Sequence, residues 1–316
     1  MSTRPTPRLA DLPPSPAGRT GWPWNVETPP VDGPASAWPS VTVVTPSFNQ
    51  VSFIEATIRS VLLQGHPRLE YRVVDGGSTD GSIAVIERYA PWLSGWSSER
   101  DTGPAQALNR GFAGAAGDVV AWLNSDDRYL PGTLQAVSRA TQDRPDAAAW
   151  VGACRSVGAD GRVLYVNMPH GLALPDLADW MGAGWFAQPA SFYRRDALSR
   201  AGSLDEGLQS SFDVDLFIRL ARLGPIAPTD ALWAEETVHP AARTSAAPGR
   251  SFAELRIVQA RHGYEALAIR ALTAELQELA GYRRLRFADC LRRALSSTLL
   301  GRPWRPGVPP PGSSRR

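Results

Sequence analysis

Five consecutive apolar residues, Val119 to Leu123, are followed after two positions by two adjacent carboxylates, Asp126 and Asp127. A strand without polar positions must be covered on both faces, as in the middle of a parallel sheet flanked by helices. Ligands of open α/β sheets bind outside the carboxyl ends of the strands, so the two aspartates are predicted at the ligand end. The alternative interpretation is a polar turn that caps a helix opened by Pro131.

Two strand–helix units precede this strand. β-Branched residues predict a strand at Val41–Thr45, and the apolar spacing after it predicts a helix from about Val51 to Leu63, capped by Asn49. The second unit is a strand at Tyr71–Val74, a glycine-rich loop and a helix at Ser82–Tyr89.

The loop of the second unit, Asp75–Gly81, combines glycines with the hydroxyl groups of Ser78 and Thr79. Glycine lets the backbone approach a ligand closely, and a helix amino terminus favours anions, so the loop is a candidate phosphate contact. It lacks both the lysine of a P-loop and the glycine spacing of a dinucleotide-binding turn.

Strands and helices alternate through residue 140, with a short strand at 96–98 and a helix begun by Pro104. This order predicts an α/β fold, a single Rossmann-like domain of three layers (αβα) with a mostly parallel central sheet. The many prolines of residues 1–39 predict an extended arm, which Trp22 and Trp24 are expected to pin to the domain. The predicted parts are the Pro-rich arm at 1–39, the globular domain at 40–247 with halves at 40–130 and 131–247, a helical extension at 248–300 and a disordered tail at 301–316.

The second half of the domain is predicted to begin with a hairpin, Ala147–Ala153 and Arg162–Asn167, that turns at Asp160-Gly161. Asp196 is expected to cap a short helix. A later strand is predicted at Pro228–Ala234.

A helix predicted at Phe212–Arg222 carries two acids. Because successive helical residues turn about 100°, Asp213 and Asp215 point roughly 160° apart. Asp213 shares a face with the apolar stripe, either as a first-turn acid satisfied by backbone N–H groups or as a general base facing a cleft. Asp215 shares a face with Arg219, so a solvated ion pair is predicted there.

Beyond Pro248 the pattern changes to long helices. The last of them carries an apolar stripe, Phe287–Leu299, beside several arginines, which suits either the headgroup region of an anionic membrane or docking on the protein's own core. An earlier apolar seam, for a partner helix or for the domain itself, consists of Ile269, Leu272, Leu276 and Leu279.

The composition is that of a globular protein, with 316 residues, 43% hydrophobic, 20% charged, and a net charge of +2. So small a charge argues against nucleic acid as a partner. Neither a bilayer helix of roughly 20 apolar residues nor an apolar signal core is present, so a cytoplasmic protein is expected, at most peripheral on the inner face of the cytoplasmic membrane. Cys154 and Cys290 are too far apart to indicate a disulfide framework or a zinc site.

Four short motifs follow one another along the domain. They are Thr45–Asn49, Asp75–Asp80, Asp101–Gly103 with Asn109, and Leu123–Asp127. In this order and spacing they resemble family 2 of the glycosyltransferases, over residues Val41–Ser245. The resemblance implies the GT-A fold and an inverting enzyme of the bacterial polysaccharide or glycolipid type.

The resemblance also implies roles for individual residues. Asp213 corresponds to the family's catalytic base. Asp127 and His239 correspond to ligands of Mn²⁺ or Mg²⁺, although a lone histidine is usually structural. Asp126 is implied to face the ribose, and Arg243 is placed where a guanidinium would meet the diphosphate.

Gln188 and Pro189 match the family's acceptor loop. One departure concerns the nucleotide base, because Gly76 stands where many relatives have a second aspartate. Phe48 stands where a tyrosine is frequent, and its ring is expected either to stack on the base or to join the core. The residues implied to bind the nucleotide sugar are Pro46, Ser47, Phe48, Asn49, Asp75, Ser78, Asp101, Gly103, Asn109, Asn124 and Asp126.

The predicted function is transfer of one sugar from a nucleotide-diphosphate donor, expected to be a UDP sugar, to a hydroxyl group of a saccharide or lipid-linked acceptor in cell-surface polysaccharide biosynthesis. The alternative is an inactive sugar-nucleotide-binding subunit of a polysaccharide assembly complex. A dinucleotide-binding dehydrogenase is disfavoured because the first strand is not followed by the glycine-rich fingerprint.

Overall fold

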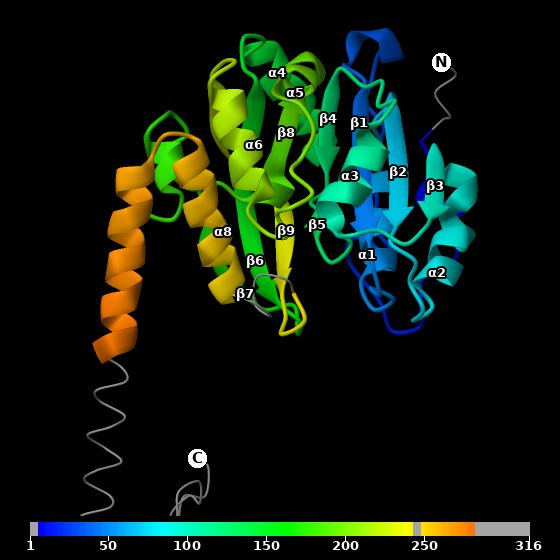
Figure 1. Ribbon diagram of the computed structural model, residues 1–316. Coiled ribbons are helices and arrows are strands. Elements are labelled where there is room, and N and C mark those ends of the chain that lie inside the picture. The colour runs from blue at the N-terminus through cyan, green and yellow to red at the C-terminus, as the bar shows by residue number, and fades with distance from the viewer. Residues whose placement is uncertain (1–5, 243–247, 282–316) are drawn as a thin grey trace, which may run out of the picture. The chain divides into compact units, whose positions relative to one another are not determined.

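The computed structural model describes residues 6–242 and 248–281 (Figure 1). The chain divides into two compact units, Met1–Gly263 and Tyr264–Arg316. The first unit contains the sheet, and in the second unit residues 265–281 are helical.

Within the described residues, nine strands form one sheet. They are β1 (Val41–Ser47), β2 (Leu69–Asp75), β3 (Gly95–Ser98), β4 (Val119–Trp122), β5 (Arg128–Tyr129), β6 (Ala149–Gly158), β7 (Val163–Asn167), β8 (Ser191–Arg194) and β9 (Ile226–Val238). Their order is β3-β2-β1-β4-β8-β6-β9-β5, and β7 pairs with β6 beside this path. The first four strands are parallel, as their alternation with helices predicts.

The helices of the first unit follow the predicted pattern closely, and α2 has the predicted bounds. They are α1 (Ile54–Leu62), α2 (Ser82–Tyr89), α3 (Pro104–Phe112), α4 (Thr133–Asp143), α5 (Arg195–Ala201), α6 (Phe212–Ala221) and α8 (Pro248–Arg261).

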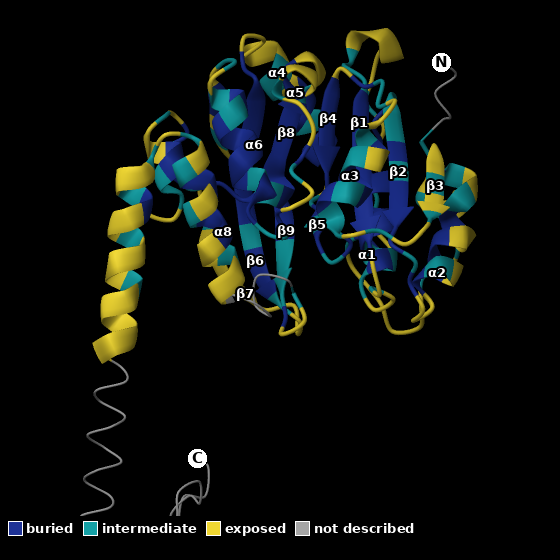
Figure 2. Ribbon diagram, in the orientation of Figure 1, coloured by how far each residue is buried: buried dark blue, intermediate teal, exposed yellow. Residues whose placement is uncertain are grey.

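Successive residues of the central strands face two different helical layers. Val43 belongs to the apolar cluster that includes Ile54 of α1. The next residue, Val44, faces α3, where a Cβ added to Gly111 would lie only 2.3 Å from its Cγ1 atom. Val119–Leu123 is buried throughout (Figure 2), so both faces of this strand are covered, as predicted.

The parallel strands end at one edge of the sheet. In register, Ser47 at the end of β1 pairs with Asp75 of β2, and Asp75 also pairs with Ser98 of β3. Val44 pairs with Trp122, so the chain leaves β4 at the same edge. This edge is therefore the predicted ligand end.

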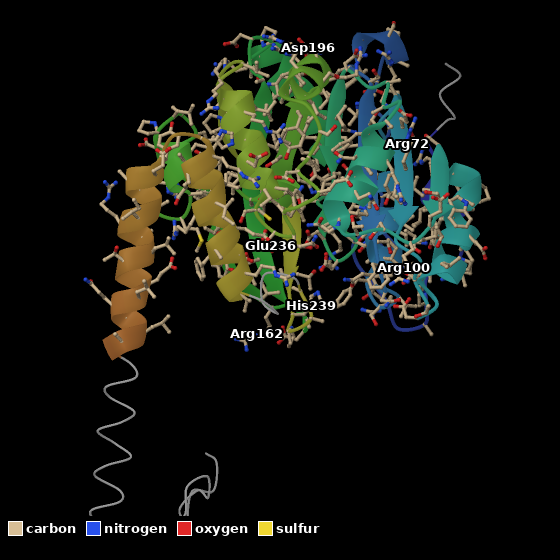
Figure 3. The ribbon with its side chains drawn as sticks, in the orientation of Figure 1. Arg72, Arg100, Arg162, Asp196, Glu236 and His239 are labelled. Carbon is tan, nitrogen blue, oxygen red and sulfur yellow. The ribbon has the colours of Figure 1, made fainter. Side chains whose placement is uncertain are left out.

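Antiparallel pairing enters the sheet in its second half. β6 and β7 form the predicted hairpin, and β8 is antiparallel to both β4 and β6. β9 is parallel to β6 and extends beyond the predicted Pro228–Ala234 to Val238. The longer strand brings Glu236 and His239 to the edge where β4 ends (Figure 3).

The amino-terminal arm packs on the rest of the first unit. Trp22 donates its indole N–H to the carbonyl of Tyr129 at 2.7 Å, and Trp24 is only 7% exposed. Both indoles pin the arm, as predicted.

Arg59 of α1 is the main polar anchor of the arm. Its side chain is 1% exposed, and all five of its N–H donors are used, four of them by the arm. The acceptors, at 2.9 to 3.3 Å, are the carbonyls of Pro13, Pro23 and Trp24 and the hydroxyls of Ser15 and Tyr89.

Two predicted helix caps are wrong, because each side chain has another partner. The N-cap of α1 is Phe53, and Asn49 lies four residues before it. Asn49 has a positive φ of 52°, and its Oδ1 accepts the Thr79 N–H at 2.9 Å. Asp196 lies in the first turn of α5, after the N-cap Arg194, whose Nε it pairs with at 2.8 Å.

The structure groups α8 with the first unit, although the sequence predicts the end of the domain at residue 247. The apolar seam of the 265–281 helix is 42 to 65% exposed. Arg243, the stripe at 287–299 and the tail at 301–316 lie outside the described residues. Among the helices that are described, none combines the length and the apolar character needed to cross a bilayer.

Replacing Arg59 by methionine should detach the arm. The substitution leaves buried carbonyls without donors, at about 1 to 3 kcal/mol each, so we expect the free energy of unfolding to fall by several kcal/mol. Chemical denaturation measures the loss, and limited proteolysis reports exposure of residues 6–39.

Arg88→Met is the matched control, since Arg88 is half exposed and pairs with Glu55 at 3.2 Å across the surface. Its loss should cost less than about 1 kcal/mol. Equal denaturation midpoints for the two variants would show that other contacts hold the arm.

Candidate active site

A cavity of about 600 Å³ opens at the edge where the parallel strands end. Residues that follow β1, β3 and β4 line it together with residues from α6 and the end of β9. Figure 3 shows Arg100, Glu236 and His239 toward this edge, whereas Asp196 lies at the opposite edge.

A side chain of α1 holds the turn that follows β4. The Thr57 hydroxyl lies 2.9 Å from the Ser125 carbonyl and 2.7 Å from the Asp127 carbonyl. The Asp127 carboxylate points inward and accepts the Thr237 N–H at 3.1 Å and the Asn124 amide at 3.2 Å. Asp127 is therefore 5% exposed, although it lines the cavity.

His239 contacts the first carboxylate of the pair. Its Nε2 lies 3.1 Å from Asp126 Oδ2, and its ring stacks on Phe53 with centroids 4.7 Å apart. The sequence pairs His239 with Asp127 as metal ligands, whereas the structure brings the imidazole against Asp126.

Like charges crowd the buried carboxyl of Asp127. Burial raises its pKa well above the ordinary value, and the negative charges of Asp126 and Glu236 raise it further. The Thr237 N–H and the Asn124 amide oppose this shift. A cation beside the pair would relieve the repulsion.

Asp75 organises the second loop from inside. It is fully buried and accepts the N–H groups of Gly77 and Ser78 at 3.0 and 2.8 Å and the Ser98 hydroxyl at 2.7 Å. The Ser78 hydroxyl donates to Asp75 at 2.5 Å and accepts the Asn49 N–H at 2.7 Å. These three predicted nucleotide residues hold the loops together and do not line the cavity.

Asp101 fills the space that the missing aspartate of the second loop would need. A Cβ built on Gly76 would lie 2.6 Å from Asp101 Oδ2. Asp101 lines the cavity together with Phe48, which is 57% exposed and so does not join the core.

The predicted acceptor residue Gln188 is tied to the end of β4. Its amide donates to the Trp122 carbonyl at 2.9 Å and accepts from Asn124 at 3.1 Å. Gln188 and Pro189 begin the short 3-10 helix η5 (Gln188–Ala190) and line the cavity.

Asp213 lies at the start of α6 and lines the cavity. Burial raises the pKa of its carboxyl to about 7, and the charge of Glu254 adds to the shift, while the Val214 N–H, 2.8 Å from Oδ1, opposes it. A carboxyl group with this pKa is poised to exchange a proton near neutral pH.

Asp215 is not the solvated acid that the sequence predicts. It pairs with Arg219, at 2.7 and 2.9 Å, but it is 8% exposed because His262 covers it and lies 2.8 Å from Oδ1. His262 follows α8, so α8 closes over this side of α6.

Most of the predicted site residues meet in the cavity, and five do not line it. Those that line it are Pro46, Ser47, Phe48, Asp101, Gly103, Asn124, Asp126, Asp127, Gln188, Pro189 and Asp213. Those that do not are Asn49, Asp75, Ser78, Asn109 and His239. Asn109 instead joins α3 to Leu204, by bonds of 3.0 and 2.9 Å.

The sequence missed an aromatic wall of the cavity and several of its polar residues. The aromatic side chains belong to separate segments, so no periodic signal linked them. The missed aromatic residues are Trp122, Tyr165, Trp180, Trp185, Phe186 and Phe212, and the missed polar residues include Gln209 and Glu236.

The model of the family Glycosyl transferase family 2 matches residues 42–201 of the chain. The chain belongs to this family. The matched segment contains the four motifs and Gln188-Pro189, whereas Asp213 and His239 follow it.

Bacterial glycosyltransferases are similar to the chain in sequence. An uncharacterized glycosyltransferase of Mycobacterium tuberculosis is 32% identical over 187 residues, which cover 58% of this chain and 69% of the relative. TuaG of Bacillus subtilis, named for teichuronic acid biosynthesis, is 33% identical over 143 residues, 44% of this chain and 56% of its own length.

Two solved structures share the fold. TarS of S. aureus, residues 1–349 in complex with UDP-GlcNAc, has a TM-score of 0.57 at 20% identity, over 70% of this chain and 66% of that chain. The mannosyltransferase PcManGT of Pyrobaculum calidifontis, in complex with GDP-Man and Mn²⁺, has a TM-score of 0.51 at 22% identity, over 86% of this chain and 84% of its own. The fold is therefore GT-A, as predicted.

The residues present suit a divalent cation that also binds the substrate. Mn²⁺ and Mg²⁺ prefer oxygen ligands such as carboxylates, and Mg²⁺ is typically held by one or two carboxylates together with substrate phosphates. Among the described residues no group of three acidic, histidine or cysteine side chains is arranged to hold a metal alone. Asp126 and Asp127 fit such a shared site because their negative charges crowd one another, and the His239 imidazole lies beside Asp126.

Replacing Asp215 by asparagine should destabilise the protein. Asparagine keeps the shape but leaves Arg219 and His262 without their buried carboxylate, which should cost about 3 to 5 kcal/mol. The free energy of unfolding from chemical denaturation measures the loss.

Asp205→Asn is the control, because Asp205 pairs with Arg261 near the surface and should contribute less than about 1 kcal/mol. A loss at Asp215 no larger than at Asp205 would contradict the buried role of Asp215.

Proposed function

We propose that the protein is an inverting, metal-dependent glycosyltransferase that moves one sugar from a UDP-sugar donor to a hydroxyl group of a saccharide or lipid-linked acceptor in cell-surface polysaccharide biosynthesis. The observation that carries the proposal is that Asp213, with its pKa near 7, lines the same cavity as the Asp126-Asp127 turn. Membership of family 2 and the relative named for teichuronic acid biosynthesis support it.

Asp213 takes the proton from the attacking hydroxyl group. With a pKa of about 7 the carboxylate is basic enough to accept this proton and is still substantially ionised at neutral pH. A single displacement inverts the anomeric carbon and needs only one carboxylate for proton transfer.

Asp126, Asp127 and His239 would hold the cation together with the diphosphate of the donor. The cation, when bound, supplies the positive charge that offsets the negative charge growing on the leaving diphosphate. The His239 Nε2 atom lies 3.1 Å from Asp126 Oδ2, so the two side chains face each other.

Asp101 and Phe48 bind the nucleotide base. The exposed Phe48 ring offers a stacking face, and the Asp101 carboxylate beside Gly76 accepts an N–H of the base, which suits uracil. The second candidate is an inactive subunit that binds a sugar nucleotide. It would retain these residues but lack a working general base or metal site.

The activity should depend on pH through Asp213. Its pKa is raised, so the carboxyl group is protonated, and inactive as a base, below about pH 7, and kcat should fall as the pH drops through that value. Asp213→Asn should lower kcat by roughly 10²-fold or more with the Kd for UDP nearly unchanged.

Asp143→Asn, at the exposed end of α4, is the control and should leave kcat and the pH profile as in the wild type. Normal turnover by the Asp213→Asn variant would mean that another group is the base.

Mn²⁺ should strengthen UDP binding through the acidic pair. We expect calorimetry to show weaker UDP binding in EDTA than in Mn²⁺, and Asp126→Asn and Asp127→Asn to lose most of that difference. Activity of the wild type that survives in EDTA, with unchanged UDP affinity, would refute the metal assignment.

A further inference from the structure

Two stacked indoles form part of the cavity wall. Trp180 and Trp185 lie with ring centroids 5.0 Å apart and an interplanar angle of 9°, and both are partly exposed in the cavity. They belong to the segment between β7 and η5, and no pattern in the sequence places them at the site.

The indole pair lies next to the proposed base. Phe186, which follows Trp185, stacks on Phe217 of α6 with centroids 3.8 Å apart, and it also contacts Trp180 at 5.8 Å. Phe217 is one helical turn after Asp213, so the two share a face of α6. A ring held by the indoles therefore lies on the side of the cavity where Asp213 takes its proton.

The indole pair is held in place by the surrounding backbone. His170 and Trp185 are joined by two backbone hydrogen bonds, of 3.0 and 2.8 Å. Gln259 of α8 donates to the Ala178 carbonyl at 2.9 Å, and so supports the short 3-10 helix η4 (Asp176–Asp179) just before Trp180. A preformed aromatic surface loses little conformational entropy when a ligand binds.

We propose that Trp180 and Trp185 form an acceptor subsite that stacks against a pyranose ring, so that the acceptor presents a sugar rather than an alcohol of a lipid. This inference rests on the proposed transferase function. The C–H groups on one face of a pyranose carry partial positive charge and are attracted to the negative face of an aromatic ring. The polar side chains of Gln188 and Gln209 line the same cavity, and sites for small molecules use a few such groups to fix the orientation of the ligand.

Saturation-transfer NMR on the full chain tests the subsite, with UDP and Mn²⁺ present and with methyl hexopyranosides and their disaccharides as probes. We expect the wild type to saturate the C–H protons of at least one pyranoside, and hexanol to give no comparable signal. Trp180→Ala and Trp185→Ala should weaken pyranoside binding by about 2- to 10-fold. The phenylalanine variants, which keep an aromatic face, should recover part of it.

Trp96→Phe, on β3 away from the cavity, is the matched control and should bind as the wild type does. The subsite is refuted if no pyranoside binds the wild type, or if Trp180→Ala and Trp185→Ala bind pyranosides as well as the wild type does. Binding of UDP and slow hydrolysis of UDP sugars are measured separately, so a failure of the transferase proposal is distinguishable from a failure of the subsite.

A second observation concerns Glu254 of α8, outside the segment that the family model matches. Its carboxylate is 8% exposed and accepts three successive backbone N–H groups, those of Gln209 at 3.0 and 3.1 Å, Ser210 at 2.7 Å and Ser211 at 3.2 Å. A carboxylate in this position also suits the positive end of the helix dipole.

We infer that Glu254 is a positioning residue for Asp213. The three N–H groups belong to the residues that lead directly into α6, and Gln209 and Ser210 line the cavity themselves. Fixing this loop sets the direction in which Asp213 enters the cavity.

Glu254→Gln tests the inference, because glutamine keeps the shape and removes the charge. We expect kcat to fall about 10- to 100-fold with the KM for the donor nearly unchanged. Glu254 is the charged group that raises the pKa of Asp213, so loss of its charge should move the acidic limb of the kcat profile to lower pH.

Glu278→Gln, at an exposed position of the 265–281 helix, is the control. A lower melting temperature of the Glu254 variant with unchanged kcat and pH profile would show that Glu254 is only structural.

Discussion

Two adjacent carboxylates at the end of a buried strand repel each other, and much of the first unit is arranged around that repulsion. Thr57 holds the carbonyls of the turn from α1, while Thr237 and Asn124 bind the inward carboxylate. His239 reaches the other carboxylate from the end of β9. Elements that are distant in the sequence therefore meet at Asp126-Asp127, and the cavity forms where they meet.

The sequence predicted the parts of the fold whose signals are local. Val119–Leu123 reads as a strand covered on both faces because burial leaves no polar position in it. Ser82–Tyr89 and Pro104 mark helices by spacing and by proline at the first turn. Motifs after successive parallel strands meet at one edge, so most predicted nucleotide residues line the cavity.

What the sequence did not predict depends on contacts between distant residues. Helical periodicity separated Asp213 from Asp215 correctly, but only the folded chain brings His262 over Asp215 and changes a surface pair into a buried one. Trp180 and Trp185 are linked to α6 through Phe186, whose ring stacks on Phe217 in the folded chain. Glu254 acts on a loop more than forty residues earlier.

The anchoring of the arm by Arg59 has a consequence for where this enzyme can be cut. A fragment that began at β1 would still contain a recognisable family 2 segment, yet it would carry a guanidinium built into the interior with four donors facing lost acceptors. The proline-rich arm thus supplies the acceptors of a buried cation, and a fragment without it would leave that cation without its partners.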